Sequence, residues 1–314
     1  MTAGCLLLNK QPGYTSFESL GPVKRAFATG KVCHTGTLDK FARGLLVVLV
    51  GPAVKLASWF VSGDKRYRAV FKFGEETDTL DPGGVVTAAA PVPSREALEG
   101  VIPRFTGEIE QVPPLYSAVH VNGKRAHELA RSLQGKEKAA ADREMKKRKV
   151  IVHSAALLSW DPPLAELEIH CSKGTYIRSL ARDMALAAGS RAHVVSLTRT
   201  AVGNFSLAEA LDLPAGGADA DAGELLRRAL KPLSPELFAR LDIPSLRIDE
   251  KTARAVAHGV NPGALRIPGL TAPGGQAVPA GASPVALFRF NSFAALIERD
   301  EKKAWRYGNV NAAC

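Results

Sequence analysis

The chain has 314 residues, of which 46% are hydrophobic and 23% are charged, an ordinary composition for a globular protein. This apolar content argues against a largely disordered chain, and no stretch approaches the ~20 apolar residues that a membrane helix needs. The net charge of +10 favours a polyanionic partner. Nucleic acid ranks first and an anionic membrane surface second, against the plainer reading of a merely soluble basic protein.

The strongest local patterns predict three strands and one helix. Residues 45–50 form a continuous apolar run, which predicts a strand buried on both faces. Residues 67–73 are rich in aromatic and β-branched side chains, and residues 164–171 end in apolar and polar alternation, so both predict strands. Apolar residues then recur at helical spacing over 177–188, with Gly189 as a stop signal. This mixture, without regular strand–helix alternation, predicts an α+β fold.

Two stretches rich in glycine, alanine and proline or aspartate predict linkers or long loops, at 214–223 and 268–284. The first stretch lies near the end of the strongly patterned region and indicates a domain boundary between residues 215 and 245. Strand-like segments at 285–290 and 293–297 then predict a small β-rich domain at the C-terminal end.

The spacing of the cysteines and the absence of the familiar cofactor motifs argue against a bound cofactor. Four cysteines are widely spaced, with no CxxC and no Cys/His pairing at zinc spacing, so neither a disulfide framework nor a metal site is expected. The sequence contains no P-loop, no GxGxxG after a strand, no HExxH and no GxSxG. The N-terminus has no basic leader of the signal-peptide kind. We therefore expect a cytoplasmic protein whose chemistry uses side chains alone.

The most unusual segment is residues 31–39, which gathers His34, two threonines and Asp39 immediately before the buried strand. An aspartate after a turn most often serves as a cap or turn residue. The functional alternative is a carboxylate nucleophile or base at the mouth of a sheet. A buried carboxylate would need a cation, and Arg178 is a candidate, although composition alone favours a surface position on its helix.

Tyr67 is the second candidate, because it lies among cations in the segment 64–68. Basic side chains bind phosphates, and an aromatic ring can stack on an unpaired base. The alternative is a half-buried tyrosine at a strand edge. Tyr176 and Arg178 fall at the corner between the third strand and the helix, where side chains project from a rigid base.

Six segments in a fixed order resemble the TruB family of tRNA pseudouridine synthases. Each motif alone is weak, but the resemblance extends from Gly4 to about Leu211 and keeps the family order. The segments are GCLLLNKQPG from Gly4, HTGTLD from His34, DKRYR from Asp64 with GEETDTLD from Gly74, PPLYSA from Pro113 with GKR from Gly123, KGTYIRSL from Lys173, and AHVVSLTR from Ala192.

The resemblance implies a pseudouridine synthase fold with a mixed, mainly antiparallel sheet and a central RNA-binding cleft. It implies a catalytic domain over residues 1–240 and a PUA-like RNA-binding domain over 241–314. The implied reaction isomerises uridine to pseudouridine at position 55, in the T-arm loop of tRNA. No cofactor and no metal are expected, and neither is a membrane or an obligate protein partner. The enzyme would be a monomer that acts on the T-arm stem-loop.

The resemblance also assigns roles to residues of the cleft. Asp39 is the nucleophile, and it attacks either the base or the sugar of a uridine that has left its stack. Tyr67 stacks on the target base and accepts a proton, and Arg178 pairs with Asp39. The remaining substrate contacts fall to His34, which holds the loop around the extruded base, and to Tyr176 and Leu197.

Several positions depart from the family pattern. Asn9 stands where the family usually has an aspartate, and Lys40 follows the nucleophile where a proline is usual. None of these changes removes a catalytic residue. Three rival readings remain: a tRNA-binding or tRNA-folding protein without chemistry, a guide-RNA-dependent relative, and a basic hydrolase that uses Asp39 and His34.

Overall fold

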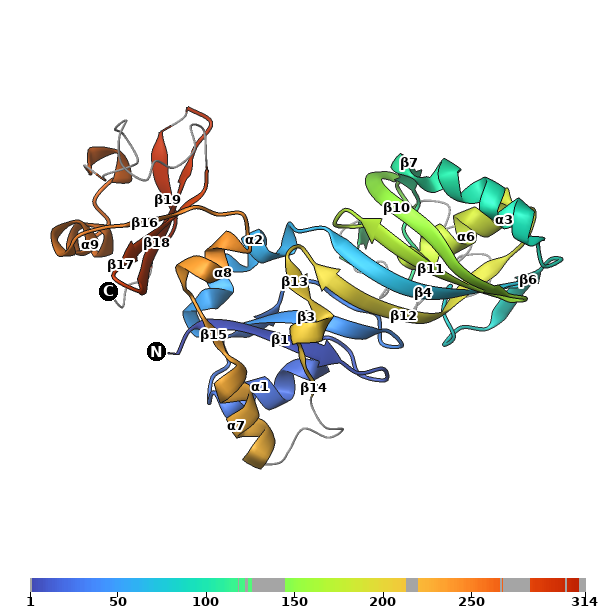
Figure 1. Cartoon of the computed structure of the whole chain (residues 1–314), viewed down its shortest axis with the longest axis horizontal. Helices are drawn as coiled ribbons and strands as arrows, with labels where there is room; N and C mark the ends of the chain where they lie inside the picture. Colours follow the sequence, from blue (N-terminus) through green and yellow to red (C-terminus); the bar gives the residue numbers. More distant parts are fainter. Residues whose placement is uncertain are drawn as a thin grey trace.

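The computed structural model describes residues 2–117, 119–121, 124–125, 145–212, 220–265, 267, 283–302 and 304–310. Its dominant feature is an eleven-stranded mixed sheet (Figure 1). Eight strands follow one another across this sheet in the order β14 (Leu211–Asp212), β1 (Gly4–Lys10), β3 (Arg43–Val50), β12 (Ala192–Val202), β4 (Lys65–Phe73), β11 (Leu164–Cys171), β10 (Arg148–Asp161) and β7 (Gly107–Gln111). Three short strands pair with members of this series: β2 (Val32–His34) with β3, β13 (Phe205–Ser206) with β12, and β15 (Lys231–Pro232) with β1.

Most neighbours in this sheet are antiparallel, and the β1–β14 and β3–β12 pairs are parallel. The mixed, mainly antiparallel sheet and the α+β class are therefore confirmed. The structure describes two further two-stranded pairs, β5 (Glu75–Thr77) with β6 (Val86–Ala89) and β8 (His120–Val121) with β9 (Lys124–Arg125).

The burial of each central strand follows from its sequence. From Gly44 to Val50, β3 is buried throughout, as its unbroken apolar run predicts. In β4, buried residues alternate with more exposed ones, so one face lines a core and the other carries cations. The predicted helix is α6 (Ile177–Ala187), and Gly189 follows it with a φ of +71°, a backbone conformation that favours glycine.

Helices cover the sheet in separate groups. The core of β4, β10, β11 and β12 is closed by α6 and α3 (Arg95–Val101), which lie together at one end of the molecule in Figure 1. At β1 and β3, one face packs against α1 (Gly21–Ala26) and α7 (Ala220–Ala229). The opposite face contacts α2 (Ala57–Val61) and α8 (Pro235–Ala239). Short 3₁₀ helices occur at Glu18–Leu20, Gly51–Leu56, Ile102–Phe105, Leu207–Glu209 and Pro262–Ala264.

The prediction of a loop over 214–223 is wrong for residues 220–223, because α7 begins at Ala220. Asp221 lies in the first turn of this helix, and Leu226 is fully buried against β1 and β3, so packing stabilises a segment whose composition suggested a linker. The first half of that stretch lies outside the described residues, as does most of 268–284.

A small four-stranded sheet forms the C-terminal region, as the sequence predicted. Its order is β16 (Ser245–Arg247), β17 (Val285–Arg289), β18 (Ser292–Arg299) and β19 (Trp305–Val310), and α9 (Glu250–Ala257) packs on it. Phe238 of α8 contacts Phe288 and Phe293, which joins the small sheet to the large one. The domain boundary at residues 240 and 241 and the PUA-like character stay predictions. None of the described helices has the length and apolar character to span a membrane.

Candidate active site

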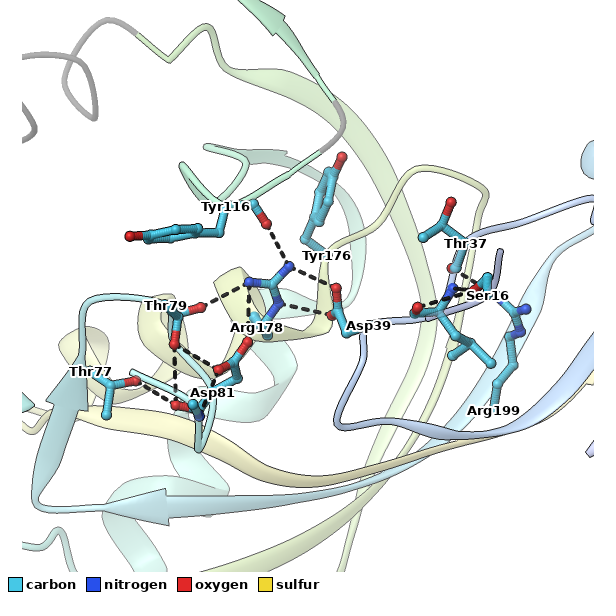
Figure 2. Close-up of polar contacts among 12 residues, drawn as sticks. Ser16, Thr37, Asp39, Thr77, Thr79, Asp81, Tyr116, Tyr176, Arg178 and Arg199 are labelled. Carbon is cyan, nitrogen blue, oxygen red and sulfur yellow. Dashed lines mark hydrogen bonds and ion pairs between the residues drawn. The ribbon is translucent and has the colours of Figure 1, made fainter. Parts of the chain in front are cut away.

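An ion pair between Asp39 and Arg178 is the centre of the site (Figure 2). Nε of Arg178 donates to Oδ2 of Asp39 at 2.9 Å, and Nη2 donates to Oδ1 at 2.9 Å. This bidentate geometry fixes the plane of the carboxylate as well as its position. Asp39 comes from the loop before β3 and Arg178 from the first turn of α6.

The guanidinium group of Arg178 is buried, so the surface position that composition favoured is wrong. Only 4% of its side chain is exposed, against 33% of the Asp39 side chain. The remaining donors reach the backbone, with Nη1 2.8 Å from the carbonyl oxygen of Thr79 and Nη2 2.9 Å from that of Tyr116. A carboxylate of Asp81 lies 3.6 Å from Nη1. Arg178 thus holds the carboxylate of Asp39 in a fixed position, while that carboxylate stays accessible to a substrate.

The loop that carries Asp39 is held by Arg199 of β12 and by Ser16, which lies in the segment after β1. Arg199 donates to the carbonyl oxygens of Gly36 and Thr37 at 3.0 and 3.2 Å, and to that of Leu45 at 2.8 Å. The hydroxyl of Ser16 accepts from the amide of Leu38 at 2.8 Å (Figure 2). Each of these bonds satisfies a backbone group that a buried loop would otherwise leave unpaired.

Lys10 holds the other side of the same loop. Its Nζ donates to the carbonyl oxygen of Ala42 at 2.6 Å and lies 3.4 Å from that of Lys40. Burial lowers the pKa of Lys10 to about 8, although the nearby Asp39 opposes that shift. Sequence reasoning gave no role to Lys10, Ser16 or Arg199. The available signal was a cation inside an apolar strand, which in a folded chain needs a partner.

A cavity of about 260 Å³ opens at the Asp39 carboxylate. That volume lies just below the range of ~300–1,000 Å³ for drug-sized ligands, so it suits one small ring system. The structure brings five of the predicted site residues together on its walls: Asp39, Tyr67, Tyr176, Arg178 and Leu197.

The two tyrosines of the cavity differ in how they are held. Tyr67 is nearly fully buried in β4, and this burial raises the pKa of its hydroxyl, so Tyr67 is a neutral phenol at neutral pH. The half-buried strand-edge alternative is therefore wrong. Tyr176 is the residue before α6, and Gln111 holds its backbone by accepting from its amide at 2.7 Å and donating to its carbonyl oxygen at 3.0 Å. Figure 2 shows Tyr176 beside the Asp39–Arg178 pair.

His34 is not among the residues that line the cavity. It ends β2, opposite Val48, and its neighbour Thr35 reaches the cavity instead. Among the described residues, Nδ1 of His34 is buried without a hydrogen-bond partner. Burial and, second, the charge of Arg199 lower the pKa of His34, so its imidazole is neutral at neutral pH.

Solved structures share this architecture. A solved Cbf5–Nop10–Gar1 complex contains a chain that superimposes with a TM-score of 0.64 at 21% identity, over 98% of this chain and 84% of that one. The archaeal box H/ACA sRNP Nop10–Cbf5 complex gives a TM-score of 0.64 at 23% identity, over 98% and 85%. These likenesses show the fold alone, which this chain shares with a chain in each of these complexes.

The sequence comparisons are more specific. Residues 24–177 match the model of the TruB family pseudouridylate synthase N-terminal domain. The chain is 51% identical over 210 residues to tRNA pseudouridine synthase B of Borreliella burgdorferi (strain ZS7), covering 66% of this chain and 72% of that relative. It is 40% identical over 258 residues to the protein of that name from Chromohalobacter salexigens, covering 82% and 80%. The chain therefore belongs to the TruB family of pseudouridylate synthases.

Proposed function

We propose that this protein isomerises uridine to pseudouridine in tRNA, at position 55 of the T-arm loop, with Asp39 as the nucleophile. The observation that carries the proposal is the Asp39–Arg178 pair, which holds a partly exposed carboxylate in a fixed orientation at a cavity sized for one ring. The family membership of the chain supplies the reaction class, and its net charge of +10 suits an RNA substrate.

The reaction requires the target base to leave its stack, which costs a few kcal/mol. The carboxylate of Asp39 then attacks, at the ring or at the sugar, and the N1–C1′ bond breaks. The uracil turns within the cavity, C5 bonds to C1′ and the bond to Asp39 breaks. The hydrogen on C5 leaves as a proton, and N1 takes up a proton in exchange. Reactant and product have the same composition, so the chemistry consumes no co-reactant.

Each cavity residue has a distinct part in this scheme. Arg178 is a positioning residue, because it fixes both oxygens of Asp39 before the base arrives. Tyr67 stacks on the base and relays the C5 proton: its oxygen takes this proton as its own hydroxyl proton passes to solvent, so the phenol is neutral before and after the step. Tyr176 and Leu197 close the cavity around the ring, and both lie on its wall. His34 acts from behind this wall, where it supports the loop that begins at Thr35.

The enzyme is proposed to work as a monomer in the cytoplasm on free tRNA, without an obligate protein partner and without a guide RNA. The rival reading is a tRNA-binding protein that keeps the fold and performs no chemistry. The two readings differ in one observable, because only an enzyme changes the covalent structure of the RNA that it binds.

The test is to map pseudouridine in an unmodified tRNA transcript after incubation with the purified protein. Carbodiimide marks pseudouridine, and the marked residue stops reverse transcription. We expect one stop, at position 55, and none in a transcript that carries cytidine there. A stop elsewhere would contradict the assigned site, and binding without any stop would favour the non-catalytic reading.

A further inference from the structure

Three metal-ligating side chains meet on the face of the large sheet that does not form the cavity. Asp64 immediately precedes β4, His153 lies in β10, and His170 is next to the last residue of β11. Their nearest ligand atoms all lie within 4.8 Å of one another. His170 points away from the core that its neighbours Ile169 and Cys171 enter, as alternation along a strand requires.

A β-bulge brings His153 into this cluster. In the pairing of β10 with β11, Val152 lies opposite Cys171 and Ser154 opposite His170, so His153 is the extra residue on its strand. A bulge of this kind re-aims the side chain that it contains. The imidazole rings of His153 and His170 consequently lie with their centroids 4.6 Å apart.

The distances match the needs of a small divalent ion. Oδ2 of Asp64 lies 3.0 Å from Nε2 of His153 and 3.9 Å from Nε2 of His170. Two ligand atoms at ~2.1 Å from a tetrahedral zinc ion lie roughly 3.4 Å apart, midway between these two values. Two imidazoles and one carboxylate are also the mixed nitrogen and oxygen set that zinc accepts.

We propose that Asp64, His153 and His170 form a surface site for one zinc ion, with the fourth position taken by water. Asp64 and His170 line a hollow of about 440 Å³, which gives water access to that position. The ion would tie the beginning of β4 to β10 and β11. Its role is therefore structural, and the isomerisation does not pass through it.

The surroundings suit a moderate affinity. Arg66 lines the same hollow as His170 and repels a cation. Of the three proposed ligands, Asp64 alone carries a negative charge, so the site is weaker than structural zinc sites built from thiolates.

The direct test titrates zinc chloride into the tag-free, full-length protein in a buffer that does not chelate metals. We expect one zinc ion per chain with a Kd below about 10 μM. The substitutions His153→Ala and Asp64→Asn should each weaken binding by at least about 10-fold. The control His258→Ala removes an exposed histidine of the C-terminal region and should leave binding unchanged.

Cobalt and thermal unfolding give two readouts that do not depend on activity. Cobalt bound to wild type should show the visible absorption of four-coordinate Co²⁺, and His153→Ala should lose it. Zinc should raise the Tm of wild type and leave that of the variant unchanged, because a ligand stabilises only the state that binds it. Wild type that takes up no zinc, or His153→Ala and Asp64→Asn variants that bind it as tightly as wild type, would overturn the proposal.

Discussion

Replacing Arg178 with lysine keeps a positive charge beneath Asp39 and removes the planar group that holds both carboxylate oxygens. The guanidinium donates two bonds to Asp39 and one each to the carbonyl oxygens of Thr79 and Tyr116. A lysine has three donors on one atom, so at least one of these four bonds is lost, and the two oxygens of Asp39 are no longer fixed together.

Both stability and turnover should fall. A hydrogen bond to a charged group contributes about 1.5–3 kcal/mol, so Arg178→Lys should lower the free energy of unfolding by about 2–3 kcal/mol. A nucleophile displaced by 1 Å can lose ~10²-fold in rate, equivalent to about 2.7 kcal/mol of transition-state stabilisation. We therefore expect turnover to fall about 100-fold, with little change in the Kd for tRNA.

The assay combines urea unfolding, tRNA binding and single-turnover formation of pseudouridine. The control is Arg182→Lys, because Arg182 lies one turn further along α6 and donates to Asp183 and to the carbonyl oxygen of Val112, away from Asp39. This variant should keep turnover close to that of wild type. If Arg178→Lys turned over within about threefold of wild type, the positioning role of the guanidinium would be refuted.

Three further substitutions test other parts of the structure. Tyr67→Phe keeps the ring and removes the hydroxyl, so single-turnover rates should fall at least ~10²-fold while tRNA binding stays constant; a rate near that of wild type would exclude proton transfer by Tyr67. Hydrogen bonds from Arg240 lower the pKa of Glu209 to about 2 from 4.5, so this pair contributes stability above pH 4.5 that is lost as the pH falls towards 2. At neutral pH the free energy of unfolding of wild type should exceed that of Glu209→Gln by only about 1 kcal/mol, because the pair is partly exposed. Urea unfolding should show this difference shrinking as the pH falls, and a difference that grows would contradict the assignment. Phe288→Ala opens the aromatic cluster that joins the two sheets and should cost about 3–5 kcal/mol by denaturant unfolding, whereas a loss below about 1 kcal/mol would show that the cluster contributes little.

Local patterns predicted the elements whose burial is regular. The apolar run of β3, the alternation in β11 and the helical spacing of α6 each depend on residues within one segment. No comparable pattern marks β10, because its 14 residues are mostly exposed or half-buried and its pairing with β11 is interrupted by bulges. Composition misassigned the beginning of α7, since the stability of that helix comes from contacts with distant strands.

Site residues could be predicted from the sequence where they lie in a recognisable motif. Residues that come together only in the folded chain could not. Asp39 and Arg178 are 139 positions apart. The need of a buried carboxylate for a cation made Arg178 a candidate partner, and the resemblance to the TruB family assigned the pair. Lys10 and Arg199 bind backbone carbonyl oxygens, which every residue carries, so no sequence pattern marks their partners. Asp64, His153 and His170 meet only because three strands pair in one register and one of them bulges.

The most direct test of the central claim measures tritium release from tRNA labelled at C5 of uridine, with wild type and Asp39→Asn compared at equal tRNA binding. C5 loses its hydrogen when it becomes the glycosidic carbon, so release follows the isomerisation itself. We expect release by wild type and none by Asp39→Asn, while Asp161→Asn, at an exposed aspartate of the β10–β11 hairpin, behaves as wild type. Release by Asp39→Asn at the rate of wild type, or no release by either protein with tRNA still bound, would contradict the account.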